Sequence, residues 1–330
     1  MKRNWTEEEL YTHWYMLPSE LNLLTNKHQT NRLGFALLFK FFQLEGRFPT
    51  SSREIPISVI EFMVIQVGCS FDNWNGYTWD GVTIKRHRIE IRNWFGFREG
   101  SLADQERFKS WLIEEIIPYE HREDRLRDVL LQRYRSFKIE PPVSVHRLIQ
   151  SAVQEHETKF CGEIFRRLSP DTLVNMDKLL EPSFSEEGEA ERTNWQYLKE
   201  EPGKAGIESV KSAAIRLNVL REIKLPPDLF KTFPSKLSER YARQAAVKEP
   251  FELRRHAGQL RFTLMASFLI RRSEYLTDHL ADLLIETVHK MSKKAERKVE
   301  DGMGEVLHKA SSKMVKLYEI AKASIGNPKV

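Results

Sequence analysis

Cysteine is nearly absent from this sequence of 330 residues, and long apolar runs are absent altogether. The two cysteines, Cys69 and Cys161, lie far apart and outside any Cys-x-x-Cys spacing, which excludes a disulfide framework and a cysteine-based zinc site. No stretch approaches the roughly 18 consecutive apolar residues of a membrane span. The first nine residues are polar apart from Met1 and Trp5, so they do not form a secretory signal. We therefore expect a cytoplasmic protein without a membrane partner.

The sequence also lacks the common motifs of catalysis. It contains no P-loop, no dinucleotide-binding glycine pattern, no nucleophile elbow and no His-Glu-x-x-His. The ten histidines are dispersed, and His87 and His121 lie among arginines, which favours surface or capping roles over metal ligation. The sequence therefore predicts no catalytic residue, no metal site, no cofactor and no small-molecule substrate.

Charge of one sign is not in large excess. Lys and Arg number 52 against 47 Asp and Glu, so the formal net charge of +5 indicates a polyanionic partner only weakly. The hydrophobic fraction of 41% suffices for a proper core, and the length favours two or three domains.

Helical periodicity and capping signals run along most of the chain. Thr6-x-x-Glu9 is a capping box, residues 31–44 are apolar almost all round, and residues 57–67 form a second apolar segment before Gly68. Alternating β-branched runs are scarce. We therefore predict an all-α fold, arranged as a multi-domain array of helices.

Breaks in this pattern suggest the domain organisation. We expect a first helical domain at residues 1–140, with two lobes split near the turn-rich segment 73–81. A helical connector is expected at 141–205, with a mobile acidic linker at 181–192, where apolar periodicity is missing. A long-helix scaffold or dimerisation domain is expected at 206–330.

Two basic stripes lie on predicted helices of the first domain. The helix at 31–47 leaves one narrow polar stripe that contains Arg32, Lys40 and Arg47. The helix at 83–95 has an apolar face with a basic stripe beside it, made of Lys85, Arg88 and Arg92, while Arg86 points elsewhere. Such a helix can dock on a core and offer its cations to DNA, although a charged helix face is often merely solvated.

A very long helix is predicted from Gln259 to about Glu300. Its apolar stripe is either core or a dimer seam and consists of Leu269, Leu276, Leu280, Leu283, Thr287 and Met291. Late in this helix lies a basic face that either complements the dipole of the helix end or contacts phosphates: Lys290, Lys293, Lys294 and Arg297.

One segment is distinctive as a whole: Thr-Asn-Arg-Leu-Gly-Phe-Ala-Leu-Leu-Phe-Lys-Phe-Phe-Gln-Leu-Glu-Gly-Arg-Phe-Pro, residues 30–49. It resembles the signature at the start of transposases of class II replicative transposons, the Tn-three family. Further segments resemble the same family, so that the likeness spans nearly the whole chain: residues 85–98, 112–126, 250–256 and 283–297.

This resemblance implies a function. Members of the family bind the terminal inverted repeats of their transposon through the amino-terminal region and carry a later Asp-Asp-Glu catalytic domain, for which magnesium is expected. We expect this chain to lack that domain, to be no enzyme by itself, and to bind double-stranded DNA in the nucleoid, with a homodimer as a further partner. The first domain would then hold helix-turn-helix-like lobes, with residues 83–95 as the recognition element.

A second hypothesis remains beside sequence-specific DNA binding. The chain could be a helical protein-interaction or dimerisation scaffold, in which the basic faces are solvated. A mobility shift with DNA at low salt, combined with sedimentation, separates these two functions.

Overall fold

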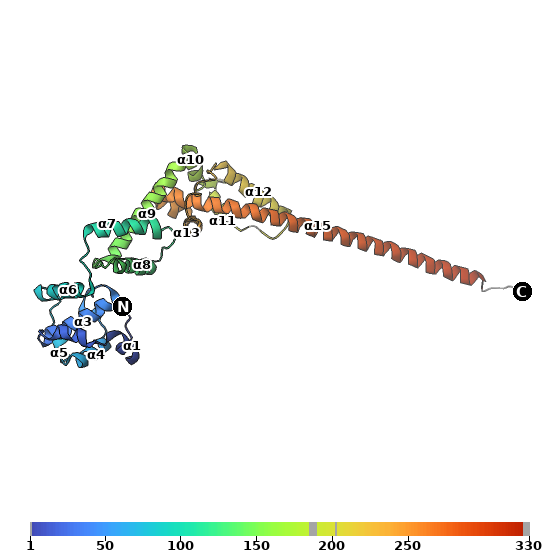
Figure 1. Ribbon diagram of the computed structural model, residues 1–330. Helices are drawn as coiled ribbons and strands as arrows, with labels where there is room; N and C mark the ends of the chain where they lie inside the picture. Colours follow the sequence, from blue (N-terminus) through green and yellow to red (C-terminus); the bar gives the residue numbers. More distant parts are fainter. Residues whose placement is uncertain (1, 185–189, 202, 326–330) are drawn as a thin grey trace. The chain divides into compact units, whose positions relative to one another are not determined.

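The computed structural model describes residues 2–184, 190–201 and 203–325, and these residues are mostly helical (Figure 1). The predicted all-α fold is confirmed. The chain forms two compact units, Met1–Lys159 and Phe160–Val330. The boundary therefore falls inside α9 (Val145–Arg167), within the range 141–205 expected for a connector.

The first unit opens with a lobe built around one buried helix, α3 (Gln29–Glu45). Its residues Leu33 to Phe42 are all buried, and Gly46 ends it in the left-handed conformation with φ of 69°. Short side chains and glycine allow such a conformation at low cost, so the helix stops there. Around α3 pack the other elements of this lobe: α1 (Glu7–Trp14), α2 (Pro18–Leu21), η1 (Asn22–Leu24), η2 (Ser52–Glu54), α4 (Ile57–Val67), α5 (Asp72–Asn75) and α6 (Val82–Phe95).

The segment predicted as a loop, residues 73–81, is not a lobe boundary. It begins in α5, and its Trp74 and Tyr77 are buried in the core of the first lobe. The Tyr77 hydroxyl lies 2.8 Å from Nδ1 of His87 on α6, and the two rings stack. The predicted surface role of His87 is therefore wrong, because its side chain is 6% exposed.

A second lobe of the first unit has its own core, which extends from Phe108 to Val153. It consists of α7 (Leu102–Trp111), the π-helical turn η3 (Leu112–Ile116), α8 (Glu123–Ser136) and the first part of α9. Ser101 caps α7, and Asp104 completes a capping box. The lobes thus divide between Phe97 and Phe108, some twenty residues beyond the expected position.

Two sets of contacts join these lobes within the first unit. The backbones of Arg98 and Ile139 form a parallel bridge, in which Arg98 N donates to Lys138 O at 3.0 Å and Glu140 N donates to Arg98 O at 2.9 Å. The Arg135 guanidinium donates to the carbonyl oxygens of Gln43 and Leu44, at the carboxyl end of α3. These carbonyls have no partner inside their helix, so the second lobe caps the central helix of the first.

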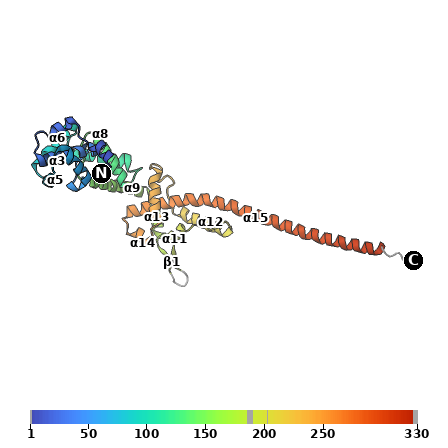
Figure 2. The ribbon, with the colours of Figure 1, turned by 90° about the horizontal axis from the view of Figure 1, so that it is seen from below.

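The second unit is built along the first third of α15 (Gly258–Ile325), with α12 and α13 packed beside it (Figure 2). Its core includes Trp195, Tyr241, Met265 and Leu269. The remaining elements are α10 (Pro170–Lys178), α11 (Asn194–Lys199), α12 (Ile207–Glu222), α13 (Ser235–Ala246) and α14 (Pro250–Arg255). Ser169 caps α10, with Pro170 at its first position.

The acidic linker expected at 181–192 is corrected in part. β1 (Pro182–Phe184) and β2 (Ala190–Thr193) pair antiparallel, which the sequence did not predict. The remaining residues of that linker, 185–189, lie outside the described residues. Polar strand residues in so short a pair give no alternation long enough to detect.

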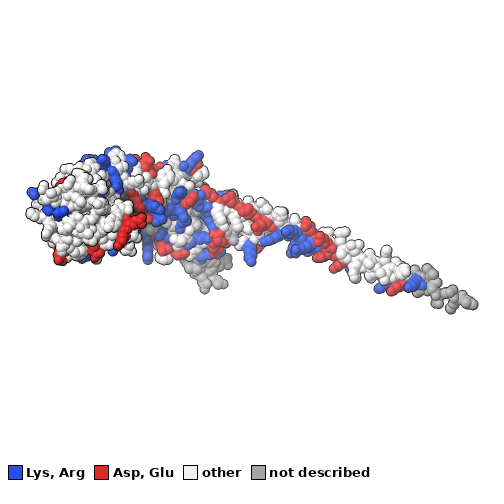
Figure 3. All heavy atoms as spheres, turned by 60° about the horizontal axis from the view of Figure 1, so that its bottom comes forward, with Lys and Arg blue, Asp and Glu red and all other residues white. Residues whose placement is uncertain are grey.

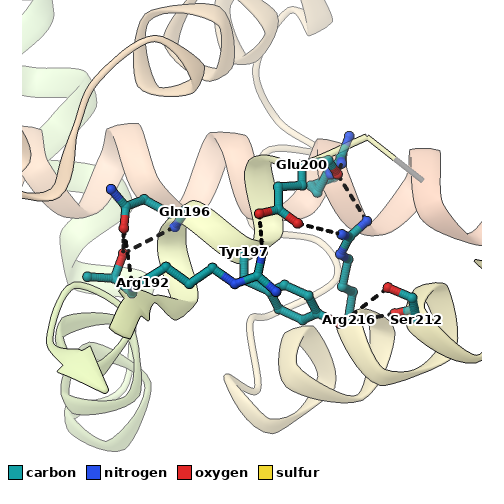
Figure 4. A network of polar contacts seen from close by, with 8 residues as sticks. Arg192, Gln196, Tyr197, Glu200, Ser212 and Arg216 are labelled. Atoms are coloured by element: carbon teal, nitrogen blue, oxygen red, sulfur yellow. Dashed lines mark hydrogen bonds and ion pairs between the residues drawn. The ribbon is translucent and has the colours of Figure 1, made fainter. Parts of the chain in front are cut away.

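A polar network ties this strand pair to the helices (Figure 4). The guanidinium carbons of Arg192 and Arg216 lie 4.8 and 4.6 Å from the centre of the Tyr197 ring. The Glu200 carboxylate pairs with both arginines. Arg216 is 4% exposed, so its charge is compensated by a neighbouring carboxylate and ring, as burial requires.

The long helix was predicted to end near Glu300, but α15 continues to Ile325. Its predicted stripe is core as far as Thr287, with Leu269, Leu276 and Leu283 buried, whereas Met291 is 57% exposed. The basic face at 290–297 therefore lies many turns before the helix end. A dipole acts only over the last turn, so it does not explain these cations.

Candidate nucleic-acid interface

Two adjoining concavities of about 380 and 450 Å³ lie on the first unit, where its lobes meet. Both are lined by Arg88 of α6 and by residues 140–143, which precede α9. Pro141 and Pro142, which follow the end expected for the first domain at residue 140, form a rigid wall of this surface. Four residues of the predicted basic stripes converge there: Arg47, Lys85, Arg88 and Arg92.

Arg88 is the shared cation of the two concavities. Its guanidinium carbon lies 5.2 Å from the centre of the Phe48 ring, which holds the side chain against the first lobe. In the described part of the chain, its buried Nε has no hydrogen-bond partner. The guanidinium forms no ion pair among the described residues and lines both concavities, so its charge is available to an anionic ligand.

The other cations of α6 differ in their availability. Lys85 and Arg86 are exposed. Arg92 is half-buried and donates to the Glu140 carboxylate at 2.5 Å and to Glu99 at 3.4 Å. Arg92 therefore holds the lobe junction, and its charge is already balanced.

The structure corrects the predicted phosphate contact of Lys40 and shows that Arg47 is already paired with carboxylates. Lys40 is 4% exposed, and its ammonium lies 3.2 Å from the carboxylate of Glu20, which is equally buried. Arg47 is 7% exposed and pairs with Glu54 and Glu45. Helix-face plotting placed both on a polar stripe, but Lys40 neutralises a buried carboxylate and cannot reach a phosphate. Arg47 lines the first concavity with its charge already paired, so its phosphate contact stays a prediction.

The remaining predicted residues lie apart from the two concavities. Arg32, near the start of α3, is partly buried and lines neither of them. Lys290, Lys293, Lys294 and Arg297 are exposed on α15 in the second unit, where they form a blue group in Figure 3. The Lys290 ammonium also donates to Ala205 O at 3.2 Å.

Sequence reasoning missed two residues of this surface, Arg127 and His146. Arg127 is exposed on α8, opposite the buried Leu126, Leu130 and Tyr134. The signal that could have found Arg127 is its place on the polar side of an amphipathic helix, beside the buried face of α8. His146 lies beside the Glu123 carboxylate, with which it forms an ion pair when protonated.

Carboxylates limit the positive charge of the surface. Glu54, Glu99 and Glu140 line it together with the cations. Burial alone would raise the pKa of Glu54, but hydrogen bonds from Arg47 and Thr50 lower it below its ordinary value. Glu54 is therefore ionised at neutral pH and holds Arg47 in the wall.

The first lobe does not contain a short helix-turn-helix. Fourteen residues, including α5, separate α4 from α6, whereas the motif joins its helices by three or four. α6 is instead fixed by Ile84, His87 and Ile91, which are buried against the lobe.

Among residues 2–184, 190–201 and 203–325, no cluster of three or more His, Cys, Asp or Glu side chains could hold a metal ion. None of the helices described there has the length and apolar character to span a membrane.

Comparison with known proteins connects this architecture to transposases. The model of a domain of unknown function, DUF4158, matches residues 1–152, which nearly coincides with the first unit. The transposase for transposon Tn1546 of Enterococcus faecium is 21% identical over 303 residues, covering 91% of this chain and 30% of that protein. The transposase for transposon Tn3926 of Escherichia coli is 20% identical over 314 residues, covering 94% of this chain and 31% of that protein.

A third relative, the transposase for transposon Tn501 of Pseudomonas aeruginosa, is 22% identical over 284 residues and matches along 28% of its length. The chain thus spans about 30% of the length of these relatives. The chain is thus similar, over most of its length and at about 20% identity, to transposases of the Tn-three family.

Proposed function

We propose that the first unit binds double-stranded DNA at the terminal inverted repeats of a transposon, as the amino-terminal part of a replicative transposase. The observation that carries this proposal is the position of Arg88, a partly buried guanidinium that lines both concavities and forms no ion pair among the described residues. A phosphate balances such a charge. The relatives named above are transposases, which supports a DNA ligand.

α6 offers two kinds of group to such a ligand. Lys85 and Arg86 are exposed near its amino end and suit phosphates. Ile89, which is 49% exposed, and Asn93 lie further along and suit the edges of bases, since an asparagine amide pairs with adenine. The helix therefore combines backbone positioning with base recognition, as specific binding requires.

Arg127 extends this contact surface onto the second lobe. It lines the same concavity as Arg88, so a phosphate backbone along the lobe junction meets cations from both lobes. Holding the lobes together by Arg92 and Glu140 then fixes the spacing between those cations. We assign strand transfer to parts of the relatives that this chain does not match, since it spans about 30% of their length.

A competition mobility-shift assay tests the proposal. The probe is a duplex of the transposon end, and the competitor is a scrambled duplex of equal length and composition. We expect binding that resists the scrambled competitor and weakens steeply with added salt, because neutralised phosphates release their counterions. Equal competition by both duplexes would reject specific binding, and no shift at low salt would reject DNA binding.

The alternative function, a scaffold for protein interaction, is favoured by a different observation. α15 exposes large apolar side chains over its carboxyl-terminal half. The scaffold alone predicts self-association without any mobility shift. Sedimentation together with the DNA assay separates the two functions. Both functions can also be present in different units of one chain.

A further inference from the structure

One covalent connection joins the two lobes of the first unit, the segment of residues 96–101 between α6 and α7. Gly96 ends α6 with φ of 68°, and the Phe97 ring packs against the core of the first lobe. At the other end of the segment, Ser101 caps α7 of the second lobe. Residues 98–100 are therefore the linker between the lobes.

A linker this short can act as a hinge, but its backbone is paired with the second lobe. Arg98 N donates to Lys138 O at 3.0 Å, and Glu140 N donates to Arg98 O at 2.9 Å. At Gly100 the two backbones come so close that a Cβ would lie 2.5 Å from the carbonyl oxygen of Glu140. Glycine permits this approach because it has no side chain. The linker is thus held against residues 138–140.

The side chain of Arg98 holds the linker a second time. Its guanidinium donates two hydrogen bonds of 2.6 Å, one to each carboxylate oxygen of Asp104 on α7. Asp104 is 6% exposed and also accepts from the amide and the hydroxyl of Ser101, at 2.9 and 2.7 Å. The hydrogen bonds from Arg98 and Ser101 lower the pKa of Asp104, so the carboxylate is ionised at neutral pH. An arginine bound to both oxygens of a carboxylate has little freedom to move.

We propose that Arg98 is a positioning residue for DNA recognition, because it locks the linker and makes the two lobes one rigid body. This inference rests on the proposed function, in which α6 and Arg127 contact the same duplex. One added base pair between the two contacts displaces the second by about 3.4 Å and turns it by about 34° around the duplex. A hinged pair of lobes can follow that displacement, whereas a rigid pair cannot. The first unit then selects its site partly by the spacing of two contacts.

The exposure of Arg98 allows a test in the folded chain. Its side chain is 56% exposed, so Arg98→Ala removes the lock and leaves both cores intact. Arg122 provides a matched control, because it also donates two hydrogen bonds to one carboxylate, that of Asp124, at 3.2 and 2.6 Å. Arg122 precedes α8, at the end of that helix opposite the junction. Arg122→Ala thus removes an equal charge and a similar pair without touching the linker.

Duplexes of altered spacing test the proposal. Hydroxyl-radical footprints of Arg86→Ala and Arg127→Ala first locate the base pairs that each lobe contacts, and one or two base pairs are then inserted between them. For the unchanged chain we expect insertion to raise Kd by on the order of 100-fold, because one of two linked contacts is lost. Arg98→Ala should bind the original duplex less tightly but lose less than about tenfold on insertion, whereas Arg122→Ala should keep the full loss. Arg98→Lys, which cannot bind both oxygens at once, should give an intermediate loss.

Hydrogen exchange of the chain without DNA examines the junction by itself. The amides of Arg98 and Glu140 both donate within the junction, so we expect them to be protected in the unchanged chain. Arg98→Ala should remove that protection while amides inside α8 keep theirs. Gly100→Ala separates the same backbones without a change of charge and should act in the same way.

Contrary results separate this inference from the proposed function. Equal losses on insertion for the unchanged chain and Arg98→Ala would overturn the positioning role. Exchange of the Arg98 amide as fast as in an unstructured peptide would overturn the rigid junction. Protected amides in a chain that tolerates insertion would overturn the selection by spacing and leave DNA binding in place. Protected amides without any mobility shift would reject the proposed function, and this inference with it, while the rigid junction would stand.

Discussion

The phenolic hydroxyl of Tyr77 lies 2.8 Å from Nδ1 of His87, and this contact holds α6 against the rest of the first lobe. Burial is the main cause that lowers the pKa of His87 to about 4, and the nearby Lys27 adds to the effect while Glu90 opposes it. Burial also raises the pKa of Tyr77, so the hydroxyl stays protonated and donates to the neutral imidazole. The position of the proposed recognition helix thus depends on a histidine that carries no charge.

This histidine makes the first unit sensitive to acid. In the unfolded chain its pKa is near 6.5, so the unfolded state binds an extra proton between pH 6.5 and 4 and the free energy of unfolding falls as pH is lowered through that window. The loss is at most about 3 kcal/mol. His87→Asn keeps an acceptor for Tyr77 without titrating, and urea unfolding at pH 7 and 4.5 should show a flatter dependence. An unchanged slope would contradict a buried neutral His87.

Gly34 is required where α3 meets the Tyr77 ring. A Cβ on Gly34 would lie 2.2 Å from the ring carbon Cδ2 of Tyr77. Gly34→Ala should therefore displace the ring and destabilise the unit by about 1–3 kcal/mol, although alanine is the better helix former. Thermal unfolding measures the effect. Gly34→Ala combined with Tyr77→Ala relieves the clash, so its cost should be less than the sum of the two single changes.

Lys40 serves stability and not DNA contact. Lys40→Met leaves the Glu20 carboxylate buried without its cation, and we expect a loss of about 3–5 kcal/mol. Glu20→Gln combined with Lys40→Met removes both charges and should recover much of that loss. Denaturant titration measures the stability, and the folded fraction should bind DNA as before. Weaker DNA binding by the folded protein would show that Lys40 contributes to the interface.

Arg88 and Arg127 carry the proposed phosphate contacts. Arg88→Ala and Arg127→Ala should each weaken binding to specific and scrambled duplexes alike and reduce the salt dependence by about one phosphate. Arg125→Ala removes an equal charge from an exposed position of α8 two residues away and serves as control. A loss confined to the specific duplex would assign the residue to a base, and no loss at all would exclude it from the interface.

Glu140 restrains the same surface because its carboxylate lines both concavities. Glu140→Gln removes a negative charge beside Arg88 and releases Arg92, so DNA affinity should rise by on the order of 1 kcal/mol, or about fivefold. Glu114→Gln, at an exposed position of the same unit, should have no effect. Weaker binding by Glu140→Gln would show that the lobe junction matters more than the local charge.

Local signals in the sequence predicted the helices well, because caps and periodicity act over a few residues. α4 occupies residues 57–67 as predicted, and Gly68 ends it with φ of 65°. The length of α15 was underestimated, because the sequence after residue 300 contains no clear signal that ends a helix. Neither Gly302 nor Gly304 interrupts α15.

The site was predictable only in part, because burial of a polar residue depends on distant partners. Helix plotting placed Arg88 and Lys40 on comparable polar stripes, yet Lys40 meets Glu20 inside the core whereas Arg88 faces a concavity. Arg127 was missed since it reaches Arg88 only through the packing of the two lobes. The apolar periodicity of one helix does not reveal which distant residues its polar side chains contact in the fold.

The capping of α3 by Arg135 has a consequence for synthesis of the chain. The carbonyl oxygens of Gln43 and Leu44 receive their donor from a residue about 90 positions later in the sequence. At ribosomal speeds of about 5–20 residues per second, those carbonyls wait some 5–20 seconds for their partner. The first lobe is then a nascent intermediate whose central helix is completed only when α8 has emerged, so its maturation proceeds in the order of translation.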